Sequence, residues 1–285
     1  MRRRPLGARG PQVSEIGLGT VKLGRTRGLK YPAPSELPSD EQVRGLLGAA
    51  MDLGVNLIDT APAYGLAEER VGAMLPAKRE DWVICTKAGE SFERGASSFD
   101  FSGDAIKKSV DGSLHRLRTD YVDVLLAHSD GQIELDLVES GLLDTLQRIK
   151  QSGKARLVGV SVKTLEGARL AIEHGDVVML TLNPLDTESE PAIELARERG
   201  VGVLVKKALA SGHVDRIHAE SGESPADAAI RFALNHAGVS SVVIGTSNPD
   251  HLAQSVHAAL TRSKTQDTTP DIITQSPKGA RSARL

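Results

Sequence analysis

The 285-residue sequence has few of the features that mark several large classes of protein. Its single cysteine, Cys85, cannot form an intramolecular disulfide, and no stretch approaches the roughly 20 apolar residues of a membrane-spanning helix. The 35 Lys and Arg nearly balance the 37 Asp and Glu, so no basic field would attract nucleic acid or anionic lipid. The basic N-terminal stretch lacks the apolar run of a signal peptide. We therefore expect a soluble, cytoplasmic protein that binds neither nucleic acid nor a membrane.

Short apolar runs rich in Val, Ile and Leu recur along the chain, each bounded by turn residues. They predict eight β-strands, at residues 16–20, 55–58, 82–86, 122–127, 156–160, 177–181, 202–205 and 241–244. The starts of these strands lie about 32 residues apart on average, which suits a strand, a loop, a helix and a second loop.

The stretches between the strands carry helix signals. Residues Ser39 to Gln42 form a capping box ahead of a one-sided apolar stripe. Ser224 and Asn248 each precede a proline, which is tolerated at the first helical position because the backbone N–H there has no helical partner. These signals predict helices that alternate with the strands.

Eight strand–helix units without a change in composition predict an α/β fold with one closed parallel (β/α)8 barrel, a TIM barrel. The alternative is an open doubly wound sheet, but its phosphate-binding fingerprint is incomplete, because no third glycine follows Gly17 and Gly19. A Walker A-like stretch at 19–26 carries Arg25 where lysine is required. We expect a single barrel domain over residues 1–261.

Two segments fall outside the repeating pattern. The first dozen residues contain turn-forming glycines and predict a hairpin that covers the N-terminal end of the barrel. Residues 262–285 are polar and lack periodicity, which predicts a mobile or loosely docked tail.

Four polar side chains come at the ends of three successive predicted strands. Asp59, Lys87 and His128 end their strands, and Tyr64 follows Asp59 in the same loop. Each alone is compatible with a structural role, as a loop cap, a solvated charge, a hydrogen-bonded imidazole or a packing ring. The C-terminal ends of the strands form the working face of a TIM barrel, so their shared position predicts one catalytic site.

The residue types indicate the chemistry of this site. We expect Asp59 to pair with Lys87, because an unpaired buried ammonium is costly. The cation would lower the pKa of Tyr64 from about 10 toward the working pH and make the phenol a proton donor, while His128 holds a substrate oxygen. The chain shows no nucleophile–base pair and no metal-ligand spacing. The attack on carbon is therefore expected to be hydride transfer from a nicotinamide cofactor.

The segment LGVNLIDTAPAYGLAEE at 53–69, ICTKAG around Lys87 and LLAHSDG around His128 resemble the aldo-keto reductase family. The resemblance covers about residues 5–260 and implies a TIM barrel that reversibly reduces an aldehyde or ketone. It implies that Tyr64 is the general acid, that Lys87 and Asp59 adjust the pKa of Tyr64, and that His128 orients the carbonyl. It also implies a nicotinamide dinucleotide, usually NADPH, bound across the barrel mouth without a Rossmann domain.

The resemblance and the positions of the loops predict a set of cofactor-binding residues at the barrel mouth. These are Gly19, Thr20, Asp59, Ser161, Lys206, Lys207, Ser211, Gly245, Thr246, Ser247, His251 and Gln254. Where the family usually carries side chains that hold the nicotinamide, this chain has Val162, Met179 and Lys206. Nicotinamide binding is therefore expected to be weak or to depend on other residues. Positive charge at Lys206, Lys207 and His251 favours NADP, and NAD stays possible.

Two other functions stay open. Lys87 would be the Schiff-base nucleophile of an aldolase-type lyase if its pKa were low, although Asp59 beside it would keep the amine protonated. The altered nicotinamide contacts would also suit a low-turnover sensor or scaffold protein that binds the cofactor.

Long loops are expected to contact a small-molecule carbonyl or alcohol substrate. These are residues 24–38, with Tyr31, and residues 88–101, with Phe92, Phe99 and Phe101. The identity of the substrate and the oligomeric state are not determined by the sequence.

Overall fold

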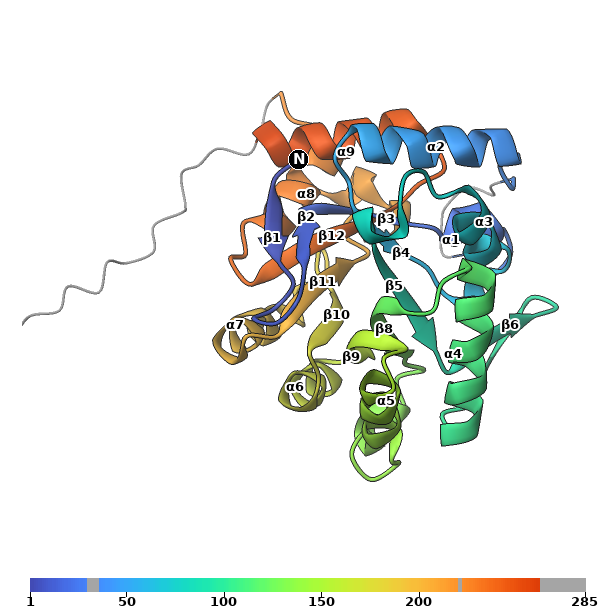
Figure 1. The fold of residues 1–285 in the computed structure, drawn as a ribbon. Coiled ribbons are helices and arrows are strands. Elements are labelled where there is room, and N and C mark those ends of the chain that lie inside the picture. The colour runs from blue at the N-terminus through green and yellow to red at the C-terminus, as the bar shows by residue number, and fades with distance from the viewer. Residues whose placement is uncertain (30–35, 220–221, 262–285) are drawn as a thin grey trace, which may run out of the picture.

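The structure is a computed structural model that describes residues 1–29, 36–219 and 222–261. Eight parallel strands close into a barrel in the order β10-β11-β12-β3-β4-β5-β8-β9 (Figure 1), which confirms the predicted TIM barrel. The strands are β3 (Ile16–Gly19), β4 (Leu57–Asp59), β5 (Val83–Ala88), β8 (Val122–His128), β9 (Ala155–Ser161), β10 (Val177–Thr181), β11 (Gly202–Lys206) and β12 (Val239–Gly245). The predicted tail at 262–285 and Tyr31 lie outside the described residues.

Helices connect the strands and surround the barrel (Figure 1). They are α1 (Val21–Gly24), α2 (Asp40–Asp52), α3 (Ala67–Met74), α4 (Gly103–Leu117), α5 (Leu142–Gln151), α6 (Leu165–His174), α7 (Glu190–Arg199), α8 (Pro225–Leu234) and α9 (Pro249–Thr261). The predicted capping box of α2 is present, because the Gln42 N–H donates to Ser39 Oγ at 3.2 Å and the Ser39 N–H donates to Gln42 Oε1 at 2.8 Å. Ser224 caps α8 by accepting a hydrogen bond from the Asp227 N–H at 3.1 Å.

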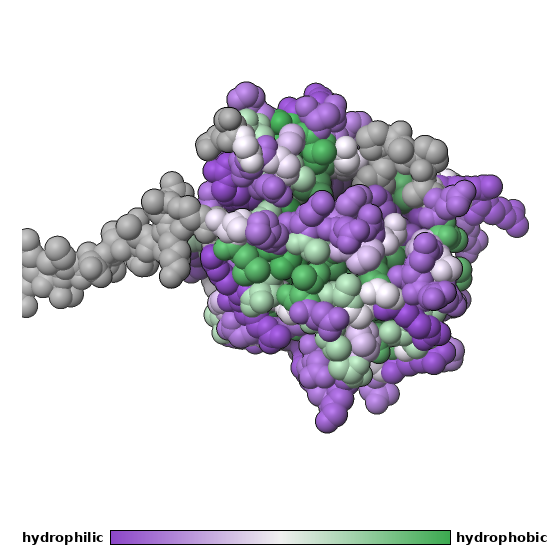
Figure 2. Space-filling model, turned by 90° about the horizontal axis from the view of Figure 1, so that it is seen from above, coloured by the Kyte–Doolittle hydropathy of each residue, from purple (hydrophilic) through white to green (hydrophobic). Residues whose placement is uncertain are grey.

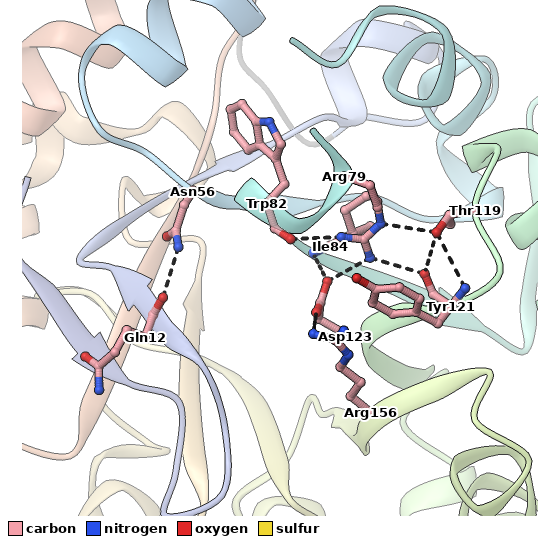
Figure 3. A network of polar contacts seen from close by, with 9 residues as sticks. All are labelled: Gln12, Asn56, Arg79, Trp82, Ile84, Thr119, Tyr121, Asp123 and Arg156. Carbon is pink, nitrogen blue, oxygen red and sulfur yellow. Dashed lines mark hydrogen bonds and ion pairs between the residues drawn. The ribbon is translucent and has the colours of Figure 1, made fainter. Parts of the chain in front are cut away.

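A hairpin of β1 (Arg3–Pro5) and β2 (Gln12–Ser14) covers the N-terminal end of the barrel, as predicted. The Arg4 guanidinium donates to the carbonyls of Val239 at 2.7 Å and Leu234 at 2.8 Å, next to the start of β12. Asn56 Nδ2 donates to the Gln12 carbonyl at 2.9 Å (Figure 3), which ties the hairpin to the start of β4.

A buried carboxylate joins three elements at this same end of the barrel. Asp123 Oδ2 accepts from the Ile84 N–H at 2.9 Å and from Arg79 at 2.8 Å, and Oδ1 accepts from Arg156 at 3.1 Å (Figure 3). The cluster therefore holds the beginnings of β5, β8 and β9 together. Because it lies opposite the C-terminal mouth, we assign it to stability.

The predicted loop at 88–101 is instead largely an antiparallel hairpin. Its strands are β6 (Glu90–Glu93) and β7 (Ala96–Phe99), joined by a turn in which Arg94 and Gly95 both have positive φ. Positive φ at both central residues is the backbone of a tight hairpin turn. The hairpin follows β5 directly, at the C-terminal end of the barrel.

Alternation along the strands sends every second side chain into the barrel. Leu57 and Cys85 belong to the apolar cluster in the barrel interior. A step of two residues from each leads to Asp59 and Lys87, and the same step from an interior residue of β8 leads to His128. The interior therefore changes from apolar to charged at the C-terminal mouth.

The outer surface is mostly polar where helices α2 and α9 lie. Seen from above, hydrophilic side chains surround a smaller hydrophobic area (Figure 2). Met51 and Leu260 are the large apolar residues that α2 and α9 expose. Among the described residues, no helix is long and apolar enough to cross a membrane.

Candidate active site

A buried ion pair joins the ends of β4 and β5. Lys87 Nζ lies 2.5 Å from Asp59 Oδ1 and donates a second hydrogen bond to the Thr60 carbonyl at 3.0 Å. The side chains are only 1% and 6% exposed. Burial by itself lowers the pKa of Lys87, but the Asp59 carboxylate, together with Tyr64 and Cys85, outweighs it and the pKa lies above its ordinary value. Lys87 is therefore an ammonium at neutral pH.

Tyr64 lies against this pair. It ends the short 3₁₀ helix η1 (Pro62–Tyr64), and its ring centroid is 4.7 Å from Lys87 Nζ. Burial raises the pKa of Tyr64 to about 12, although the Lys87 charge acts in the opposite direction. The expectation of a net lowering is thus wrong for the free protein, because the cost of burying a phenolate exceeds the attraction of one cation. The phenol stays protonated at neutral pH.

His128 ends β8, and its ring lies next to the ring of Tyr64. The two rings are 6.1 Å apart between centroids and nearly perpendicular, at 81°. His128 Nδ1 is 2.8 Å from Glu90 Oε2 of β6, a close polar contact that does not have the direction of a regular hydrogen bond. Burial lowers the pKa of His128, so the imidazole is neutral at neutral pH.

These groups meet at a large cavity in the barrel mouth, with a volume of about 1210 Å³. Of the four predicted catalytic residues, Asp59, Tyr64 and His128 line it, and Lys87 lies behind them. Most of the predicted cofactor-binding residues also line it: Gly19, Thr20, Asp59, Lys206, Lys207, Ser211, Gly245, Thr246, His251 and Gln254. Ser161 and Ser247 are not among the lining residues.

The cavity suits an elongated ligand such as a dinucleotide. Gly19 and Gly245 face each other in the β3–β12 register at the mouth, and both line the cavity. A Cβ at Gly19 would come within 3.0 Å of Val243 Cγ1, so the space there depends on glycine. Further along the cavity wall, Lys207 and Ser211 follow β11, and Thr246 lies near the N-terminus of α9. This combination is suited to phosphate groups.

Of the three residues that differ from the family pattern, Val162 and Met179 offer no polar group to the cavity, whereas Lys206 lines it. Val162 and Met179 are each 1% exposed within apolar clusters. Lys206 Nζ donates to Ser161 Oγ at 2.9 Å, so this lysine covers the serine expected to bind the carboxamide. Burial and three neighbouring lysines lower the pKa of Lys206 to about 7, which reduces its positive charge at neutral pH.

Sequence reasoning missed several cavity residues. Arg25, Glu90 and Ser97 line the cavity from within the predicted substrate loops at 24–38 and 88–101, but none of them was singled out; Lys163 lies outside these loops and lines the cavity as well. Only Glu90 carried a usable signal, as a polar residue two positions after the end of β5.

The aromatic residues of the predicted substrate loops take different positions. Phe99 lines the cavity. Phe92 lies under the Arg25 guanidinium, whose carbon is 3.3 Å from the ring centroid. Phe101 packs against the main apolar core.

The arrangement can hold and deliver a proton beside a cavity that admits a small molecule. A neutral phenol, a neutral imidazole and a charged ammonium–carboxylate pair lie together. In the part of the chain that the structure describes, no cluster of His, Cys, Asp and Glu could hold a metal ion.

Comparisons with known proteins show what this chain is similar to. The model of the Aldo/keto reductase family matches residues 15–216 and 213–272. L-galactose dehydrogenase from Arabidopsis thaliana is 30% identical, over 90% of this chain and 87% of that protein. NADH-specific methylglyoxal reductase from Escherichia coli is 29% identical, over 74% of this chain and 68% of that protein. A crystal structure from Pseudomonas aeruginosa, assigned to the aldo-keto reductases, is 45% identical with a TM-score of 0.79, over 90% of this chain and 93% of that one.

Proposed function

This chain belongs to the aldo/keto reductase family, and we propose that it reversibly reduces an aldehyde or ketone to an alcohol, with Tyr64 as the general acid. Membership makes it an oxidoreductase, and the family uses a nicotinamide cofactor. One observation carries the assignment of the site: the buried Lys87–Asp59 pair lies against the Tyr64 ring beside the cavity.

The residues of the chain divide the proton chemistry among them. When bound, the nicotinamide cofactor supplies the hydride. Tyr64 is protonated in the free protein and donates its hydrogen to the substrate oxygen. The Lys87 ammonium stabilises the phenolate that remains, and Asp59 keeps Lys87 charged and in place. His128, whose ring centroid lies 6.1 Å from that of Tyr64, would hold the substrate oxygen beside the Tyr64 hydroxyl.

We propose NADPH as the cofactor. Lys207, His251 and Gln254 line the cavity and would approach the adenosine end, with Gly19, Thr20, Gly245 and Thr246 along the dinucleotide. The support from charge is limited, because Lys206 has a pKa of about 7 and is engaged with Ser161. Since one relative is specific for NADH, both cofactors are to be compared.

The lyase alternative has no support in the geometry. A Schiff-base nucleophile must lose its proton, but Lys87 is held 2.5 Å from Asp59 and its pKa lies above its ordinary value. Lys87 is also only 1% exposed, with no access to the cavity for a substrate carbon.

The function can be tested by titrating the protein with NADPH and NADH and then screening carbonyl compounds for oxidation of the reduced cofactor. Methylglyoxal and small sugars are suitable first probes, because related proteins are named for such compounds. Tyr64→Phe should retain cofactor binding and lose about 10²- to 10⁴-fold in turnover. Full activity in Tyr64→Phe would refute the proposed acid, and binding without turnover in the wild type would favour the sensor alternative.

A further inference from the structure

We infer that Lys206 is a nucleophilic amine that reversibly binds small aldehydes as an imine at the barrel mouth. The reaction uses neither the Tyr64 acid nor a hydride, so this activity goes beyond the proposed reduction. The ligand class is an aldehyde small enough to enter the cavity.

Lys206 lies where a ligand in the cavity can reach it. It is the last residue of β11, at the C-terminal mouth, and it lines the cavity of about 1210 Å³. Its Nζ donates to Ser161 Oγ at 2.9 Å. Ser161 pairs with His128, a neutral imidazole, in the β8–β9 register. The Lys206 amine therefore lies beside the candidate active site.

Lys206 lacks the counter-charge that holds Lys87 as an ammonium. Asp59 Oδ1 lies 2.5 Å from Lys87 Nζ. Within the described ranges no carboxylate forms an ion pair with Lys206, and its Nζ donates to the neutral hydroxyl of Ser161. A buried ammonium without a counter-charge loses its proton more readily than a paired one. The amine that remains has the lone pair that a nucleophile needs.

The charges that face Lys206 act mainly in one direction. Lys207 follows it in the chain, Lys87 belongs to β5 and Lys163 follows β9, and each positive charge disfavours a further one nearby. Glu134, between β8 and α5, opposes them. Burial is the largest effect, and together with the three lysines it lowers the pKa of Lys206 to about 7. A large fraction of the amine is therefore unprotonated at neutral pH.

The Glu134 carboxylate is engaged with other partners. Its Oε1 accepts from Ser129 Oγ at 2.5 Å and from the Lys163 N–H at 2.6 Å, and its Oε2 accepts from the Thr164 N–H at 3.0 Å. The side chain is fully buried. Glu134 therefore acts on Lys206 through space and does not contact its amine.

The proposed reaction is the condensation of an amine with an aldehyde. The lone pair on Lys206 Nζ forms a bond to the carbonyl carbon, and the electron pair of the broken C=O π bond takes up a proton while Nζ releases one. The resulting carbinolamine loses its hydroxyl and the second amine hydrogen as water, which leaves a C=N bond. Nothing is oxidised or reduced, and water reverses the reaction. Only the unprotonated amine can begin it.

The adduct can be measured on the wild-type protein without cofactor. Propanal is added with sodium cyanoborohydride, whose hydride reduces the imine to a stable secondary amine. Peptide mass spectrometry gives the labelling rate of each lysine, and fragment ions separate Lys206 from Lys207. Lys108, exposed on α4, is the internal comparison. At pH 7 we expect Lys206 to be labelled at least about tenfold faster, because an ordinary lysine has less than about 0.1% of its amine unprotonated.

The pH dependence gives a second readout. Taking the ratio of Lys206 to Lys108 labelling cancels the effect of pH on the reductant. This ratio should be constant below pH 7 and fall by about tenfold per pH unit above it, because only the amine of Lys108 is still gaining unprotonated form. Lys207→Gln removes a neighbouring positive charge and should move the break in the ratio to higher pH. Lys163→Gln should move it in the same direction.

Equal labelling of Lys206 and Lys108 would overturn the inference, and so would labelling of Lys207 in place of Lys206 or a ratio that does not change with pH. The wild-type measurement decides these points even if the variants fail to fold. The result is also separate from the carbonyl screen. A protein that oxidises no NADPH can still carry the adduct, and an active reductase without the adduct would refute this inference alone.

Discussion

Lys87 Nζ and Asp59 Oδ1 are 2.5 Å apart, although the two residues are 28 positions apart in the sequence and belong to different strands. The parallel register of β4 and β5 pairs Asp59 with Cys85, so Lys87 lies two residues further toward the mouth. The long lysine side chain spans this offset. The pair is thus a product of strand register as well as of charge.

Breaking this pair should destabilise the protein strongly. Asp59→Asn leaves the Lys87 ammonium buried without a counter-charge, which is expected to cost about 3–5 kcal/mol in the free energy of unfolding. Urea unfolding of Asp59→Asn, Lys87→Met and the double variant measures the effect. The loss in the free energy of unfolding should be smaller in the double variant than the sum of the losses in the two single variants, because the double variant buries no unpaired charge. Simple additivity would show that the two residues act independently.

Tyr64 should resist ionisation. Its pKa is raised from 10.0 to about 12, so the folded protein keeps the phenol neutral while an unfolded chain ionises near pH 10. The stability associated with the neutral phenol is therefore fully present below pH 10 and is lost as the pH rises from 10 to 12. The absorbance change on tyrosinate formation, compared between wild type and Tyr64→Phe, reports this group. A midpoint for Tyr64 below pH 10 would contradict the burial argument.

Lys206 should make stability depend on pH near neutrality. Its pKa is lowered from 10.5 to about 7, so the unfolded chain binds more protons than the folded one between these values. The stability contributed by this group therefore rises with pH across that window and is lowest below pH 7.

Lys206→Met should accordingly stabilise the protein most at low pH, by on the order of 4 to 5 kcal/mol at pH 6, and progressively less toward pH 10. Urea unfolding at several pH values measures the difference from the wild type. Lys108→Met, an exposed lysine on α4, is the control and should show no such trend. An equal gain from Lys206→Met at every pH would indicate better packing in place of relief from a buried charge.

Asp123 should matter for folding and not for chemistry. It is 2% exposed and accepts hydrogen bonds from Arg79, Arg156 and the Ile84 N–H. Asp123→Ala leaves these donors without their acceptor, at a cost of about 3–5 kcal/mol.

The fraction of Asp123→Ala protein that stays folded should bind cofactor with wild-type affinity, because the Asp123 cluster lies at the end of the barrel opposite the cavity. Thermal unfolding and cofactor titration on the same sample separate the two effects. Weakened cofactor affinity in fully folded protein would show that the two ends of the barrel are coupled.

The sequence could predict the barrel because its strands are buried on both faces and therefore appear as continuous apolar runs. The hairpin of β6 and β7 was missed because it projects from the barrel. Its segment from Glu90 to Phe99 is half-buried or exposed and rich in Glu and Ser, which are weak strand signals. The turn at Arg94 and Gly95 forms through backbone conformations that no apolar pattern indicates.

The order of residues along the chain by itself determined which polar side chains reach the barrel mouth, because a strand alternates its faces and Asp59, Lys87 and His128 end three strands. Only the tertiary structure decided the state of these groups. Burial depends on every neighbour in space, and so the phenol of Tyr64 becomes a weaker acid despite the adjacent Lys87. The contact between Glu90 and His128 joins a projecting hairpin to a barrel strand, a proximity that spacing along one chain does not encode.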